Sequence, residues 1–197
     1  MKSIELKEYT LEKISILREV GFYQEFVGQE KRKIYNELNP RFKMDDLKLK
    51  EYFSNNDLGE EYLKMRLYQE LFLIDKSKCL PNEDGEWVYQ EGDYLPLIKG
   101  LSRISNGCFN PIEIEEKWKD GPSINIKITT STDEFLITPE YRGDWADTKT
   151  VLKTLNKLFD KHSYCYVFDE GVITFLNLNE KKELKEFGIR LIEPEMN

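Results

Sequence analysis

The stretch from residue 111 to 162 constrains the fold most, because it reads as three short strands followed by one amphipathic helix. The isoleucines at 124–128 alternate with polar residues, which is the period of a strand with one buried face. Residues 112–118 show the same alternation, and 135–138 form a short apolar run. Turn-forming residues separate the three segments. The pattern predicts an antiparallel meander, covered by a helix that begins at Asp147.

The other segments of the second half complete an α+β pattern. A helix with Pro96 in its first turn precedes the meander and ends at Asn106-Gly107. After the long helix, two apolar runs predict a hairpin, and Asn179 is placed to cap a last helix. The order is therefore α-β-β-β-α-β-β-α, with an additional edge strand at 189–192. Because βαβ alternation is missing, we expect an antiparallel or mixed sheet covered by helices.

The first third of the chain is expected to be helical. Its apolar residues recur at helical spacing, and the predicted helices are separated by capping and breaking residues. Thr10 is placed to cap the first helix, and the second covers residues 22–38 until Asn39-Pro40 ends it. A short third helix is expected at 47–53, and Asp57 opens a fourth.

A turn-rich connector separates this helical part from the sheet. No basic residue lies between Lys78 and Lys99, and proline, asparagine and glycine residues interrupt the segment. One short strand is expected within it, at 87–89. We therefore divide the chain into a helical N-terminal region, 1–80, and an α+β sheet domain, 81–197, which can pack as one globular unit.

The net charge of −8 is unevenly distributed. Residues 1–80 carry 15 basic and 15 acidic residues, whereas the remainder carries 14 and 22. These totals disfavour the basic face that nucleic-acid binding needs. An acidic half suits a basic protein partner, because long-range attraction speeds encounter. Three separated cysteines and no apolar stretch of membrane-spanning length predict a reduced, cytoplasmic protein without a membrane partner.

Motifs for catalysis or metal binding are sparse. The single histidine, His162, follows the long helix, where a helix-terminal role is favoured over catalysis. No metal-ligand spacing or phosphate loop is present, so no cofactor is expected. Glu115-Glu116-Lys117 matches the ExK pair of restriction-endonuclease-like cores, but the neighbouring strands supply no inward aspartate. A metal-dependent nuclease or hydrolase at these three residues is an alternative to a solvated, charged strand face.

The loop over residues 139–147 carries residue types typical of protein interfaces. Tyr141, Arg142 and Trp145 belong to the types enriched at interface hot spots. Trp145 has a second interpretation, as a lid folded over the core. Asp147 stands where the next helix begins, and a carboxylate there is expected to cap that helix.

Several short motifs occur in a characteristic order over roughly residues 87–187. In chain order they are Gly92-Asp93-Tyr94, Ser105-Asn106-Gly107, Glu116 with Trp118, a Pro139 turn, Trp145-Ala146-Asp147, Leu155-Asn156 and Leu178-Asn179-Glu180. This order resembles a class of bacterial immunity proteins found beside polymorphic or contact-dependent secreted toxins. The resemblance implies a small, cytosolic, non-enzymatic protein that binds a cognate toxin, commonly covering its active site. The helical first third lies outside it.

Charge distribution and the resemblance lead to one hypothesis, a cytoplasmic protein that neutralises a basic toxin by occluding it. The candidate partner-facing residues come from the acidic connector and the following loop: Glu83, Asp84, Glu86, Glu91, Asp93, Tyr141, Arg142 and Trp145. A third hypothesis is an adaptor or scaffold that associates through its helical first third. Carboxylates converging on a concave site would favour the enzyme, and an exposed acidic patch would favour the binder.

Overall fold

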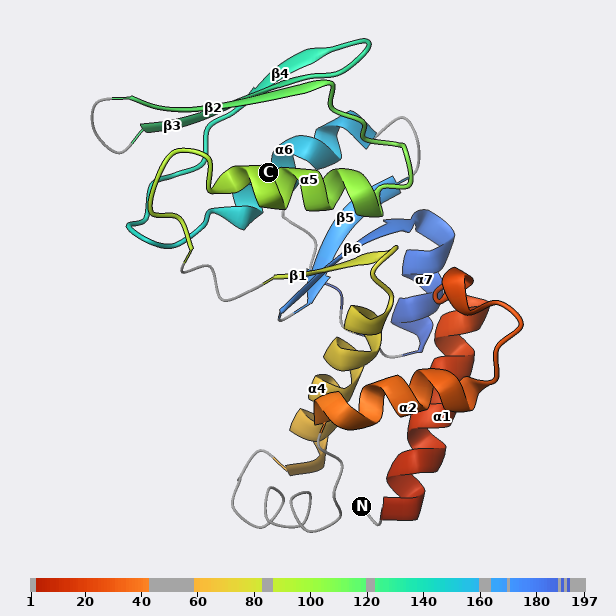
Figure 1. Ribbon diagram of the computed structural model, residues 1–197. Helices are drawn as coiled ribbons and strands as arrows, with labels where there is room; N and C mark the ends of the chain where they lie inside the picture. Colours follow the sequence, from red (N-terminus) through yellow and green to blue (C-terminus); the bar gives the residue numbers. More distant parts are fainter. Residues whose placement is uncertain are drawn as a thin grey trace.

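The computed structural model shows an α+β protein in which N-terminal helices are followed by two sheets (Figure 1). It describes residues 3–42, 59–82, 87–119, 123–159, 164–169, 171–187, 189 and 191. Among the described helices, none combines the length and the apolar composition that a membrane crossing requires. The predicted fold class is confirmed.

The elements follow one another in the predicted order, with one unexpected strand, β1. The helices are α1 (Ser3–Glu19), the 3-10 helix η1 (Gln24–Phe26), α2 (Lys31–Phe42), α4 (Gly59–Ile74), α5 (Tyr94–Ile104), α6 (Thr148–Phe159) and α7 (Leu178–Glu186). The strands are β1 (Cys79–Pro81), β2 (Glu113–Lys119), β3 (Ser123–Thr129), β4 (Glu134–Ile137), β5 (Tyr164–Asp169) and β6 (Val172–Asn177).

The meander predicted from the alternating isoleucines is the sheet β2-β3-β4, and both of its pairings are antiparallel. All three isoleucines of β3 are buried. On the opposite face of the sheet, Glu115 pairs with Lys127, which in turn pairs with Leu136, and all three are exposed. The sheet thus has one apolar face and one charged face.

The predicted hairpin forms a second sheet, of order β1-β6-β5, instead of extending the meander. The turn between β5 and β6 contains Gly171, whose φ of 93° favours glycine. Residues 172–176 of β6 are all buried, because this central strand is covered on both faces.

Layers of helices alternate with the two sheets (Figure 1). α5 and α6 lie between the sheets, and their apolar residues form one buried cluster with Tyr166 and Ile173. On the other face of the second sheet, α1, α4 and α7 form a second cluster with Val172 and Leu176. The N-terminal helices therefore pack on strands from the C-terminal half of the chain.

The capping and helix-ending signals of three helices gave wrong boundaries. α1 begins at Ser3, so Thr10 is buried inside it, because the polar first turns of this helix carry no apolar pattern. α2 continues through Pro40 to Phe42, so this proline lies in the last turn of the helix and does not end it. Asn177, not Asn179, caps α7, because its side chain and that of Glu180 form a reciprocal capping box.

The second predicted helix starts late because Tyr23 is fixed by long-range contacts. Its φ of 61° is left-handed, which interrupts a helix. Its N–H donates to Oδ2 of Asp75 at 2.6 Å, and its hydroxyl donates to the carbonyl of Leu71 at 2.8 Å. All three residues are buried, so these bonds tie the segment after α1 to the end of α4.

Other expectations have mixed outcomes. The strand expected at 87–89 is absent, because the N–H of Val88 donates to the carbonyl of Asp144 and not to a neighbouring strand. The helix expected at 47–53 and the role of His162 lie outside the described residues. Of the edge strand expected at 189–192, only residues 189 and 191 are described, and neither is in a strand.

Asn156 protects the open edge of the second sheet at β5. Its amide nitrogen donates to the carbonyl of Tyr166 at 2.9 Å, and its amide oxygen accepts the N–H of Tyr166 at 2.7 Å. Both residues are buried. One side chain of α6 therefore replaces the backbone partner that an edge strand lacks.

Replacement of Asn156 by leucine should lower the free energy of unfolding by about 2–4 kcal/mol, because it leaves two buried backbone groups unpaired. Urea denaturation followed by far-UV circular dichroism measures this loss. The exposed neighbour Lys157 provides a control, since Lys157→Ala should leave the denaturation midpoint unchanged. Equal midpoints for Asn156→Leu and the parent protein would show that the amide is not needed.

Candidate partner-binding surface

Glu116 is the buried member of the Glu115-Glu116-Lys117 sequence. It is 6% exposed and points from β2 toward the first turn of α5. Its Oε2 accepts the N–H of Tyr94 at 3.0 Å, and its Oε1 accepts the indole N–H of Trp118 at 2.8 Å. A carboxylate at a helix N-terminus is favourable, because the first N–H groups of a helix lack partners within it. Glu116 thus joins β2 to α5.

Tyr94 extends this connection to the loop before α6. Its hydroxyl accepts the N–H of Asp147 at 2.8 Å, and both residues are buried. Oδ2 of Asp147 accepts the N–H of Glu140 at 2.9 Å, and Oδ1 accepts the N–H of Thr150 at 3.2 Å, which confirms the predicted cap of α6. The buried network formed by Glu116, Tyr94 and Asp147 therefore spans three segments that are distant in the sequence.

The ionisation of this network is set by its burial and its hydrogen bonds. Burial, together with the nearby carboxylates of Asp147 and Glu116, raises the pKa of Tyr94 to about 12, so its phenol is neutral near pH 7. Burial also acts to raise the pKa of Asp147. Hydrogen bonds from Thr150 and Glu140 and the charge of Arg142 outweigh burial, so the pKa of Asp147 is lowered overall.

The connector residues are held to the same framework. Oδ2 of Asp93 accepts the N–H groups of Tyr89 and Gln90 at 2.7 and 2.9 Å. Oε2 of Glu91 accepts the backbone N–H of Trp118 at 3.0 Å, at the edge of β2. With the bond from residue 88 to the carbonyl of Asp144, these contacts place residues 88–91 beside the loop before α6.

Aromatic rings and carboxylates are exposed along these two segments. Tyr89 is 67% exposed, Tyr141 41% and Trp145 48%. The ring of Tyr141 meets that of Trp118 edge-on, with centroids 5.9 Å apart. We call this region the acidic aromatic surface, and its residues are Tyr89, Glu91, Trp118, Glu140, Tyr141, Arg142, Asp144 and Trp145. Arg142 donates to the carboxylate of Glu140 at 2.7 and 3.1 Å, so its charge is matched within the surface.

The structure brings most of the described candidate residues together. Glu91 and Tyr141 both contact Trp118, Arg142 and Trp145 belong to the same loop, and Asp93 supports the backbone before Glu91. Trp145 is half-exposed and is not a lid over the core. The candidates Glu83, Asp84 and Glu86 lie outside the described residues.

Sequence reasoning missed Tyr89, Trp118, Glu140 and Asp144 as members of this surface. The sequence places Trp118 in the alternating pattern of a strand and in one motif of the resemblance, and neither marks it as part of a binding surface. The contact between Glu91 and Trp118 joins residues far apart in the chain, and no local pattern predicts it.

The residues of the nuclease hypothesis do not converge. Glu115 and Lys117 lie on the charged face of β2 and form an exposed ion pair at 2.6 Å. Glu116 points to the opposite face, where both of its oxygens accept hydrogen bonds. Among the described residues, no group of three or more His, Cys, Asp or Glu side chains is arranged to hold a metal ion. The charged pair fits the solvated strand face better than a metal site.

The comparisons with known proteins add no neighbour: no family model, curated protein or solved structure matches this chain. The acidic aromatic surface and the order of sequence motifs are therefore the features that bear on function.

Glu116→Gln should reduce the free energy of unfolding by about 1–3 kcal/mol, because a glutamine amide cannot accept hydrogen bonds through both of its ends. The matched variant is Glu115→Gln on the exposed face of the same strand, which should leave stability unchanged. Urea denaturation followed by tryptophan fluorescence measures both. Equal effects of the two substitutions would contradict the assigned roles.

Asp147 should make stability depend on pH in the acid range. Because its folded-state pKa is lowered, its contribution is complete above the unfolded pKa and is lost as the pH falls through the folded value, below about pH 4. The stability difference between the parent protein and Asp147→Asn should therefore be largest near pH 7 and shrink toward pH 3. Thermal unfolding across this range measures it, with the exposed Asp144→Asn as control. A difference that is constant with pH would refute the assignment.

Proposed function

We propose that this protein is a cytosolic, non-enzymatic binding protein, and specifically an immunity protein that neutralises a basic bacterial toxin by covering its functional surface. The observation that carries the proposal is the acidic aromatic surface, where half-exposed tyrosine and tryptophan rings stand among carboxylates. Tyrosine and tryptophan provide most of the affinity at many protein interfaces. Carboxylates around them attract a basic partner and reject an acidic one.

The buried network under the surface favours tight binding. Ordering loops on association costs free energy, and loops that are already fixed avoid that cost. Here the loop before α6 is held by Asp147, which in turn contacts Tyr94. The connector is held by Asp93 and by the bond between Glu91 and Trp118. A partner therefore meets a surface that is largely formed before binding.

The resemblance to immunity proteins supports the same proposal. Two of the motifs on which it rests, Gly92-Asp93-Tyr94 and Trp145-Ala146-Asp147, are in contact through the hydroxyl of Tyr94 and the N–H of Asp147. The motifs thus include Trp118 and Trp145 of the acidic aromatic surface and all three residues of the buried network beneath it. In the N-terminal helical region, among the residues whose burial is described, Val27 is the only large apolar side chain that is exposed, and one side chain gives the adaptor hypothesis no comparable surface.

The test is a toxin-rescue experiment. Partners are captured from the source cells at about 50 mM and about 500 mM salt, where screening weakens a charge-steered contact. A captured basic protein is then expressed in a bacterial host with and without this chain. We expect the partner to stop growth alone, and co-expression to restore it.

A pair of matched variants localises the effect. Asp144→Lys with Trp145→Ala alters the acidic aromatic surface, and should weaken binding by at least about tenfold and abolish rescue. Glu183→Lys with Leu178→Ala makes equivalent changes at exposed positions of α7, and should preserve rescue. A captured partner that is harmless, or rescue by both variants, would contradict the proposal.

A further inference from the structure

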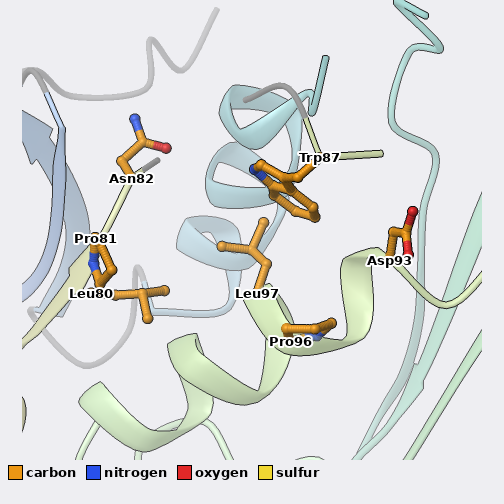
Figure 2. A pocket seen from close by; sticks show the side chains of 7 residues that line it. All are labelled: Leu80, Pro81, Asn82, Trp87, Asp93, Pro96 and Leu97. Carbon is orange, nitrogen blue, oxygen red and sulfur yellow. The ribbon is translucent and has the colours of Figure 1, made fainter. Parts of the chain in front are cut away.

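A small, mostly apolar groove lies between the end of β1 and the first turns of α5 (Figure 2). Its volume is about 370 Å³, near the lower end of the range of ligand pockets. The residues that line it are Leu80, Pro81, Asn82, Trp87, Asp93, Pro96 and Leu97.

The apolar walls of the groove are fixed by the core. α5 approaches β1 closely at Gly100, where an added Cβ would lie 2.7 Å from a methyl group of Leu80. Leu97 is buried in the cluster between the sheets, and Trp87 packs edge-on against Tyr94 with centroids 5.5 Å apart. The groove therefore exists before any ligand arrives.

Polar groups stand on both sides of the groove. Figure 2 shows the amide of Asn82 and the indole nitrogen of Trp87 facing each other across it, with Asp93 at one end. Within the described part of the chain, neither the Asn82 amide nor the Trp87 indole N–H makes a hydrogen bond. These groups match the donors and acceptors of an extended backbone, and Asn156 already binds the backbone of Tyr166 in this way.

One short backbone segment connects the groove to the loop of the acidic aromatic surface. Trp87 is followed directly by Val88, whose N–H binds the carbonyl of Asp144 in that surface. Asp93, at the end of the groove, shares its short segment with the exposed Glu91. A segment that fills the groove therefore has the carboxylate of Asp93 at one end, and Glu91 close by in the sequence, which favours a basic residue at that end.

We propose that the groove receives one apolar side chain from an extended segment of the basic partner, in which lysine or arginine flanks that side chain. This inference rests on the proposed function, and it adds which part of the partner is bound in the groove. The apolar side chain lies on Leu80 and Leu97, the backbone pairs with the Asn82 amide and the Trp87 indole N–H, and the flanking cation lies near Asp93.

The three tryptophans of the chain allow a direct test. Each gives its own indole N–H signal in a ¹H–¹⁵N spectrum, and Trp87 reports on the groove whereas Trp145 reports on the acidic aromatic surface. The probes are three nine-residue peptides that differ only at the centre: Lys-Phe-Arg, Lys-Ala-Arg and Glu-Phe-Glu. We expect the first peptide at millimolar concentration to shift the Trp87 signal, and the other two to leave it in place.

A matched pair of asparagine variants completes the experiment. Asn82→Ala should weaken the response of Trp87 to the Lys-Phe-Arg peptide at least about threefold, whereas Asn179→Ala, the same change at an exposed site on α7, should not. A Trp87 signal that stays in place, or that moves equally with all three peptides, overturns the inference. A Trp87 signal that moves with protein concentration alone also overturns it, by indicating a second copy in the groove.

The outcomes separate this inference from the proposed function. A response of Trp145 without one of Trp87 would refute the groove as the anchor site and leave the acidic aromatic surface supported. Failure of the rescue experiment together with a specific Trp87 response would refute the immunity proposal and leave a peptide-binding groove.

Discussion

Tyr94 forms hydrogen bonds through its backbone N–H and through its hydroxyl, and the arrangement of the second half of the chain depends on both. Its backbone N–H donates to Glu116 of the meander, and its hydroxyl accepts from the N–H of Asp147 at the start of α6. Each of these polar groups is buried, and an unpaired group in that position would cost about 1–3 kcal/mol. The start of α5, β2 and the loop before α6 are therefore fixed together, and the acidic aromatic surface is built on the loops that leave this junction.

The edge strands of the two sheets also leave few backbone polar groups without a partner. The open edge of β5 is covered by the amide of Asn156, and that of β1 contains Pro81, which has no N–H to offer. At β2, the carboxylate of Glu91 takes the exposed N–H of Trp118. The contact between Glu91 and Trp118 therefore protects the edge of β2 and also helps to build the acidic aromatic surface.

Much of the fold was readable from local pattern. The alternating isoleucines of β3 predicted the meander, and the spacing of apolar residues predicted α5 and α6 with their buried faces. Several helix boundaries failed for local reasons, and two further failures depended on partners far along the chain. Tyr23 leaves helical geometry because Asp75 and Leu71 bind it. β1 is likewise a strand because β6 lies beside it, and a stretch of three residues carries no period of its own.

The acidic aromatic surface was likewise predictable from the sequence only in part. Residue type alone singled out Glu91, Tyr141 and Trp145. It did not predict that the connector and the loop would meet, because Trp118 joins them from a third segment. A surface that is formed before binding requires this junction to be rigid in solution. Amide hydrogen exchange measured by NMR tests this directly: the N–H groups of Glu140 and Asp147 should exchange as slowly as those of β3. Exchange as fast as that of the exposed turn residue Ser131 would show that the loop is not held, and would contradict a surface formed before binding.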